Sequence, residues 1–107
     1  MKLAEKPMII TLDFHDCEYP KQIHQVLKEA FVFPDWYGRN WSEFWDLLNE
    51  PREYTVVEVT GLYSLHKELY EYSEKIIELL EKNKNYYKNF MEIQDQWDRR
   101  FDYKVID

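Results

Sequence analysis

The stretch that decides the fold is Phe33-Pro34-Asp35-Trp36-Tyr37-Gly38-Arg39-Asn40-Trp41-Ser42-Glu43-Phe44-Trp45-Asp46-Leu47-Leu48. It passes from a loop pattern to a helix pattern within a few residues. Pro34 restricts Phe33 to extended geometry, and Gly38 can adopt a positive φ. Asn40 with Glu43 three residues later is typical of a capping box at a helix start. The stretch therefore predicts a structured loop followed by a short helix.

The two sides of this short helix differ in character. Trp41, Phe44 and Leu48 are spaced i, i+3 and i+7, which places them on one face, and we assign them to the core. The other side and the preceding loop carry a serine, acids and bulky aromatics: Ser42, Glu43, Trp45 and Asp46, with Trp36 and Tyr37 before them. Exposed aromatics beside acids are typical of a recognition surface.

Outward from this stretch, the chain alternates between strand and helix patterns. Residues 8–14 and 101–106 alternate as strands do, residues 54–60 are rich in β-branched residues typical of a strand, and residues 20–31 repeat as an amphipathic helix does. Residues 62–84 are helical, as one helix or as two with a break near residue 72, where Ser73 could cap a new helix. Strands separated by helices predict an α/β fold with a parallel sheet, in a single domain over residues 1–107.

Residues 83–99 allow more than one interpretation. The sequence Asn83-Lys84-Asn85 looks like a helix end. Further apolar residues, among them Tyr86, Tyr87, Phe90, Ile93 and Trp97, could nevertheless extend a helical stripe, and residues 90–93 could instead form a short strand.

Composition narrows the classes of partner. The 107 residues carry 21 acidic and 14 basic side chains, a net charge of −7. This balance argues against non-specific nucleic-acid binding and favours a basic partner. The lone Cys17 cannot form an internal disulfide, so we expect a reduced, cytoplasmic compartment. We expect no membrane span and no signal peptide, because no apolar run is long enough and Met1-Lys2-Leu3 leads into none.

Motifs for catalysis or metal binding are weak. The run His15-Asp16-Cys17-Glu18 contains ligand-type residues, but neighbouring residues in an extended segment alternate in direction and do not converge on one ion. Asp95 and Asp98 form an acid pair of the kind that chance produces in so charged a chain. Cys17 has no neighbour that would lower its pKa. We therefore expect no enzyme, no metal and no cofactor.

The pattern from Pro34 to Leu48, Pro-acidic-aromatic-Tyr-Gly-x-Asn followed by Phe-Trp-Asp-x-Leu, resembles barstar and the barstar-like immunity proteins. This resemblance implies a small three-stranded parallel sheet packed with helices, and two helices within residues 62–84. It also implies an inhibitor that binds a basic nuclease toxin one to one and occludes its active site. Neither catalysis nor a cofactor is involved.

The resemblance also assigns roles to individual residues. It aligns Asp46 with the acid that enters the nuclease's phosphate site, where a carboxylate replaces a phosphate. Trp36 and Tyr37 occupy the positions that contact the rim of that site, and Trp45 adds contact area beside the acid. Where barstar has a second contacting acid, this chain has Ser42. Three further candidates are Glu43, which could carry the missing charge, Glu81 as a peripheral acid from the last helix, and Arg39 as an added positive charge in the loop.

Two other functions remain open on the sequence. The same aromatic and acidic surface could serve an adaptor that binds a partner other than a nuclease. A small enzyme is the third alternative. The departures at Ser42 and Arg39 leave the identity of the target open.

Overall fold

The order of elements follows the predicted alternation of strands and helices. The computed structural model describes residues 6–50, 52–94 and 100–107. Its elements are β1 (Met8–Asp13), α1 (Pro20–Phe31), α2 (Trp41–Leu48), β2 (Thr55–Thr60), the 3-10 turn η1 (Leu62–Ser64), α3 (Lys67–Gln94) and β3 (Phe101–Val105). The three predicted strands and the helices over residues 20–31 and 41–48 are thereby confirmed.

The sheet is parallel throughout, with β2 in the centre. Its register places Ile10 opposite Val57, and Val57 opposite Tyr103. Both crossovers step in the same direction across the sheet. Right-handed crossovers of this kind put their helices on one face, and burial agrees: Ile10 and Leu12 are buried, whereas Ile9 on the other face is half exposed.

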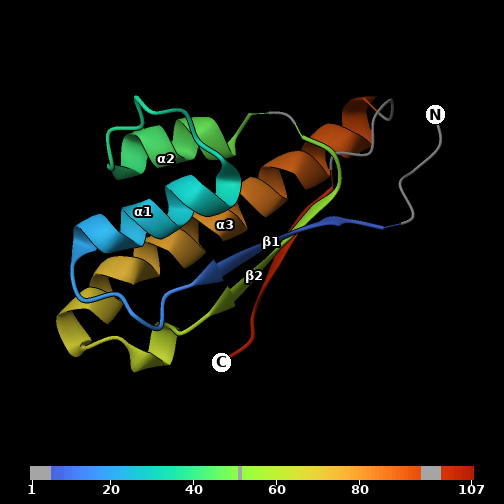
Figure 1. The fold of residues 1–107 in the computed structure, drawn as a ribbon. Helices are drawn as coiled ribbons and strands as arrows, with labels where there is room; N and C mark the ends of the chain where they lie inside the picture. Colours follow the sequence, from blue (N-terminus) through green and yellow to red (C-terminus); the bar gives the residue numbers. More distant parts are fainter. Residues whose placement is uncertain (1–5, 51, 95–99) are drawn as a thin grey trace.

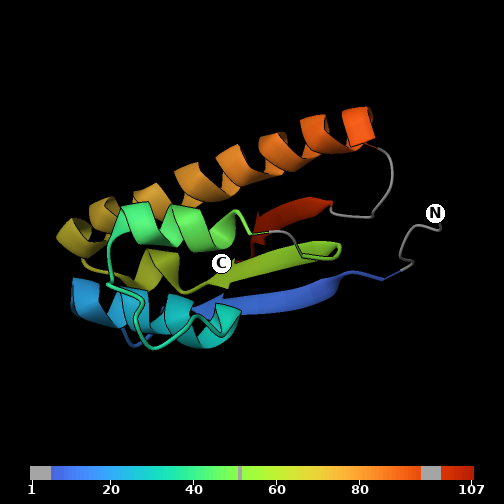
Figure 2. The same cartoon turned by 90° about the horizontal axis from the view of Figure 1, so that it is seen from above.

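Helix α2 lies outermost in the molecule. In Figure 1 it lies on the far side of α1 and α3 from the strands, and Figure 2 shows it above the space between those two helices. Phe44, Leu47 and Leu48 are buried on its inner face. The outer face of α2 is therefore free to meet a partner.

The start of α1 is fixed by side-chain capping. Pro20 occupies its first turn, where no backbone donor is needed. The Gln22 carboxamide oxygen accepts hydrogen bonds from the backbone N–H groups of Tyr19 (3.0 Å) and Glu18 (2.6 Å). Ile23 and Leu27 are then fully buried, as their spacing predicts.

Helix α3 decides the alternatives that the sequence left open. It runs without a break from Lys67 to Gln94, so the two helices that the resemblance implies are one. Ser73 does not cap a new helix, because its hydroxyl donates to the Tyr70 carbonyl oxygen within the same helix (2.7 Å). Asn83 is buried in mid-helix rather than at an end. Residues 90–93 are helical and not a strand, while Trp97 lies outside the described residues.

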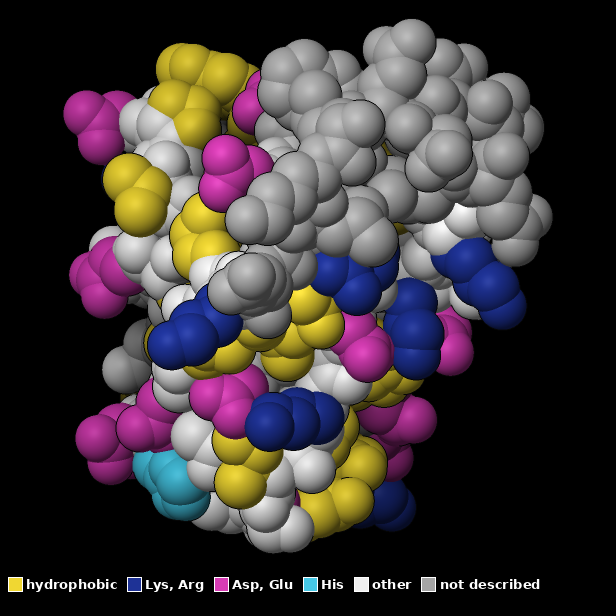
Figure 3. All heavy atoms as spheres, turned by 90° about the vertical axis from the view of Figure 1, so that its right-hand side faces the viewer, with side chains coloured by type: hydrophobic (Ala, Val, Ile, Leu, Met, Phe, Trp, Pro, Cys, Tyr) yellow, Lys and Arg dark blue, Asp and Glu magenta, His cyan; other side chains and the backbone are white. Residues whose placement is uncertain are grey.

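Charges are mixed at the end of the molecule that carries the start of β1 and the end of α3. Figure 3 shows acidic and basic side chains interleaved with apolar ones among the atoms described there. Within the described part of the chain, none of the helices has both the length and the apolar character that crossing a membrane requires.

Candidate functional site: the loop before α2 and the outer face of α2

The start of α2 is fixed by its N-cap. The Asn40 side-chain oxygen accepts a hydrogen bond from the Glu43 backbone N–H at 2.8 Å, as predicted. The reciprocal half of the capping box takes a different form. The Glu43 carboxylate accepts from the backbone N–H of Gly38 in the loop. Glu43 therefore ties the loop to the helix, and its charge is already engaged within the protein.

Gly38 leaves room for the Glu43 carboxylate and does not itself have a positive φ. The positive φ expected at Gly38 is found at the next residue, Arg39, with φ of 54°. A Cβ atom at Gly38 would lie 2.7 Å from the nearer Glu43 carboxylate oxygen. The absence of a side chain thus lets the Glu43 carboxylate reach the loop backbone.

Two neighbouring loop aromatics have opposite environments. Trp36 is 67% exposed, whereas Tyr37 is 3% exposed. The Tyr37 hydroxyl lies 2.7 Å from Nδ1 of the buried His24, and its ring packs 5.0 Å from the Phe33 ring. The Tyr37 side chain therefore packs beneath the loop, and its contact with a partner stays a prediction.

The outer face of α2 presents one acid between polar and aromatic neighbours. Ser42 and Asp46 are exposed, and Trp45 is half buried against the edge of the core. The Lys82 ammonium of α3 lies 4.5 Å from the centre of the Trp45 ring, which is a cation–π contact. We call Trp36, Ser42, Trp45, Asp46 and Lys82 the α2 surface.

Two predicted site residues lie beside this surface rather than within it. Arg39 is exposed, and its guanidinium donates to the Gln25 side-chain oxygen of α1 at 3.0 Å. Burial, and then the nearby Glu81 carboxylate, raise the pKa of Tyr103 on β3. Glu81 thus faces β3, and the α3 side chain that meets Trp45 is its neighbour Lys82.

His24 and Lys82 were not among the predicted site residues. His24 falls within the apolar stripe of α1, one residue after Ile23, and a polar side chain in such a stripe was the available signal. Lys82 carried no signal, because nothing in the sequence shows that α3 places it against Trp45.

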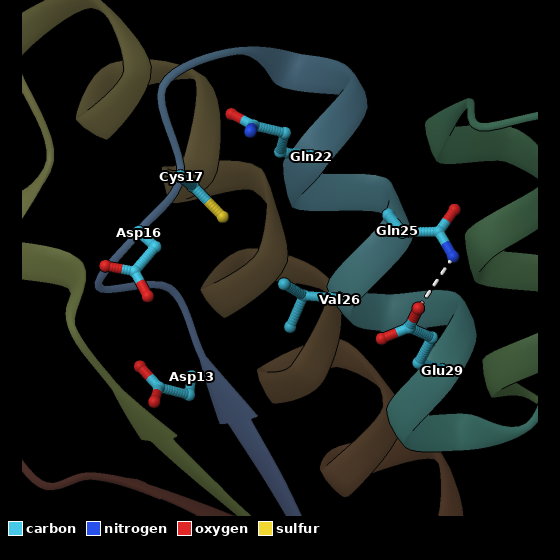
Figure 4. A pocket seen from close by; sticks show the side chains of 7 residues that line it. All are labelled: Asp13, Asp16, Cys17, Gln22, Gln25, Val26 and Glu29. Carbon is cyan, nitrogen blue, oxygen red and sulfur yellow. Dashed lines mark hydrogen bonds between the residues drawn. The ribbon is translucent and has the colours of Figure 1, made fainter.

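An open pocket lies elsewhere, between α1 and the end of β1 (Figure 4). It is lined by Asp13, Asp16, Cys17, Gln22, Gln25, Val26 and Glu29. Burial, and then Asp13 and Asp16, raise the pKa of the Cys17 thiol, which disfavours the nucleophilic thiolate. The Asp13 carboxylate accepts a hydrogen bond from the His15 imidazole and raises its pKa.

Over residues 6–50, 52–94 and 100–107, no three His, Cys, Asp or Glu side chains are grouped so that they could hold a metal ion. The acid pair Asp95 and Asp98 lies outside the described residues.

The comparisons with known proteins agree with the fold. The sequence pattern of the family described as "Barstar (barnase inhibitor)" matches residues 8–106. A protein of Bacillus subtilis (strain 168), named "Putative ribonuclease inhibitor YrdF", is 44% identical over 39 residues. Those residues are 36% of this chain and 43% of that protein, so the chain matches less than half of the relative's length. Proteins of this family are inhibitors rather than enzymes. The chain belongs to the barstar family of barnase inhibitors.

Proposed function

We propose that this protein binds the active site of a basic bacterial ribonuclease, one to one, and blocks it with the α2 surface. The observation that carries the proposal is Asp46, an exposed carboxylate on a capped helix whose opposite face is buried. Such a helix holds the charge in place before the partner arrives, so less conformational entropy is lost on binding.

Asp46 serves as the phosphate substitute in this proposal. A ribonuclease active site gathers cationic side chains that hold the RNA phosphate and the charge of the transition state. A carboxylate at that position forms charge-assisted hydrogen bonds with the same groups. RNA is then excluded both by competition for the cations and by the volume of the inhibitor.

The aromatic residues supply the apolar contact area around this acid. Trp36 projects from the loop with most of its surface in water, and large exposed aromatics are common anchors in protein interfaces. Trp45 directly precedes Asp46 in the sequence and is only partly buried, and Lys82 lies over its ring. Burial of these rings on binding would exclude water from the Asp46 contacts.

The charges around Asp46 point to a target that differs from barnase in detail. The second family acid is replaced by Ser42, and Glu43 is held by Gly38 in the loop. Lys82 adds a positive charge at Trp45, and Arg39 adds another in the loop before α2. We therefore propose a cognate toxin with fewer cations around its phosphate site, against which this protein protects the cytoplasm of the producing cell.

Titration of RNA cleavage tests the proposal. Increasing amounts of the protein are added to a fixed amount of barnase, and in parallel to a nuclease encoded beside this gene where there is one. Complete inhibition near equimolar ratio is the expected result for the cognate nuclease. Full cleavage by a nuclease that is demonstrably bound would show that the α2 surface does not cover the active site.

Asp46→Ala is the decisive variant. It leaves the cations of the nuclease unpaired in a dry interface, which costs on the order of 2–5 kcal/mol of binding free energy. The matched control is Asp16→Ala, the same substitution at an exposed acid in the β1–α1 connection. If Asp46→Ala remains folded and inhibits as well as Asp16→Ala, Asp46 is not the phosphate substitute.

A further inference from the structure

His24 is a buried polar residue that joins four segments of the chain. It lies on α1 and is 1% exposed. Its Nδ1 is 2.7 Å from the hydroxyl oxygen of Tyr37 in the loop, and its Nε2 is 2.7 Å from that of Tyr72 on α3. The ring centre of Trp41, the first residue of α2, lies 4.6 Å from the imidazole centre.

The chemistry of imidazole matches this position. Neutral imidazole has one N–H donor and one acceptor nitrogen, and a tyrosine hydroxyl can serve as either partner. Both hydrogen bonds therefore form whichever nitrogen carries the proton. Burial, and then the nearby positive charge of Arg39, lower the pKa of His24 to about 4, which keeps the ring neutral near pH 7.

The hydrogen bond between His24 and Tyr37 connects α1 to the loop before α2. Tyr37 lies directly between the exposed Trp36 and Gly38, whose N–H is bound by Glu43 of α2. The Tyr37 backbone N–H also donates to the Pro34 carbonyl oxygen at 3.0 Å. The loop is thus anchored to α1 by one residue and to α2 by the next, and Trp36 projects from that anchored segment.

We propose that His24 is a positioning residue for partner binding: through the Tyr37 hydroxyl it fixes the loop, and with it Trp36, relative to Asp46. The inference rests on the proposed function for its binding consequence. Its structural part concerns the loop of the free protein and is tested without any partner.

A matched pair of variants separates positioning from general stability. Tyr37→Phe and Tyr72→Phe each keep the aromatic ring and each remove one hydroxyl from the same imidazole. Tyr37 belongs to the loop, whereas Tyr72 belongs to α3. A role limited to stability makes the two variants equivalent, because each leaves one buried imidazole nitrogen without its partner.

The first readout is hydrogen exchange of the Gly38 and Tyr37 backbone amides, measured by NMR in the free protein. Loss of one buried hydrogen bond changes the equilibrium constant for local opening about tenfold. Tyr37→Phe should therefore speed exchange at these amides about tenfold. Tyr72→Phe should leave the exchange rates of the same amides unchanged once the change in its global unfolding free energy is taken into account. Equal acceleration in both variants, or none in Tyr37→Phe, would overturn the proposal.

The second readout is the affinity for barnase, or for the cognate nuclease once that is identified. Tyr37→Phe should weaken binding about tenfold more than Tyr72→Phe at similar melting temperature. If the wild-type protein binds neither nuclease, the proposed function fails while the amide exchange still decides the positioning role. If binding is intact and both variants bind alike, the positioning role fails while the proposed function stands.

Discussion

At the scale of single residues, the loop before α2 depends on one missing side chain. Gly38→Ala places a methyl group where the Glu43 carboxylate now lies, 2.7 Å from its nearer oxygen. The carboxylate is the far end of a flexible side chain and can move aside, so the cost is chiefly the loss of its hydrogen bond with the Gly38 N–H, about 0.5–1.5 kcal/mol. We expect chemical denaturation of Gly38→Ala to show an unfolding free energy lower by that amount, together with weaker nuclease binding.

Glu43 provides the internal control for this prediction. In a Glu43→Ala background the carboxylate is gone, so the added methyl group meets less obstruction, and Gly38→Ala should cost little further stability. A double-mutant cycle with no coupling between the two positions would show that the close approach of Glu43 is not the reason for glycine.

The same residues show where prediction from the sequence stops at this scale. The pair Asn40 and Glu43 predicted the start of α2, and the N-cap at Asn40 is confirmed. The partner of the Glu43 side chain was missed, because a capping box places it on the N-cap backbone and here Gly38 donates instead. Local spacing cannot choose between two nearby N–H donors, since the choice depends on the path of the loop.

At the scale of elements, the two faces of α2 should respond differently to truncation. Trp41 packs against His24 and Tyr72, and Trp41→Ala should lower the unfolding free energy by about 3 kcal/mol. Trp45 is only partly buried against the core, and Lys82 lies over its ring. Trp45→Ala should lower stability less than Trp41→Ala does, and nuclease affinity more. Thermal melts and nuclease titrations on the same samples measure the two effects. The reverse order of effects would mean that the binding face has been assigned wrongly.

The contacts that join α1, the loop, α2 and α3 at His24 also predict a dependence of stability on pH. The pKa of His24 in the fold is about 4, against an ordinary value of 6.5. Between these values the unfolded chain binds the proton and the fold does not, so stability is lost as pH falls from about 6.5 towards 4. The full loss from this residue is about 3 kcal/mol.

The side chains facing His24 determine how this prediction is checked. Tyr37, Trp41 and Tyr72 supply no charge that could stabilise an imidazolium, and Arg39 opposes it. The exposed His15 works in the opposite direction, because its raised pKa gives a stabilisation that is lost as pH rises. Unfolding free energies of wild type and His24→Gln from pH 4 to pH 7 isolate the His24 contribution. An NMR titration in which His24 of the folded protein protonates near pH 6.5 would contradict the prediction.

Helices and strands were predicted well where the spacing of apolar residues agrees with the residues typical of element ends. They were predicted poorly where polar residues interrupt a buried stripe. The strands and α1 follow from alternation and from the spacing of Ile23 and Leu27. The sequence left α3 open as one helix or two, because Ser73 and Asn83 are typical of helix ends. In the fold Ser73 bonds to the Tyr70 carbonyl oxygen and Asn83 is enclosed by packing, so tertiary contacts override the local signal.

At the scale of the whole molecule, the net charge of −7 bears on how fast a partner arrives. An acidic protein attracts a basic nuclease over a distance of about 8 Å at physiological ionic strength. The attraction is not uniform over the surface, because acids and bases are interleaved at the end shown in Figure 3. The α2 surface itself combines Asp46 with the nearby cation Lys82.

This mixture leads to the last prediction, on the salt dependence of association. The association rate constant with a basic nuclease should fall about ten- to a hundredfold between low salt and about 0.5 M salt, because dissolved ions screen the steering field. The dissociation rate should change less, since contacts buried in the interface are screened less. Stopped-flow mixing at several ionic strengths measures both rates. Lys82→Glu replaces a positive charge beside Trp45 by a negative one, so it should steepen the dependence of the association rate on salt. Trp45→Ala changes no charge and should leave that dependence as it is. An association rate that is flat across this range would mean that apolar contact, and not the acidic charge of the molecule, governs the encounter.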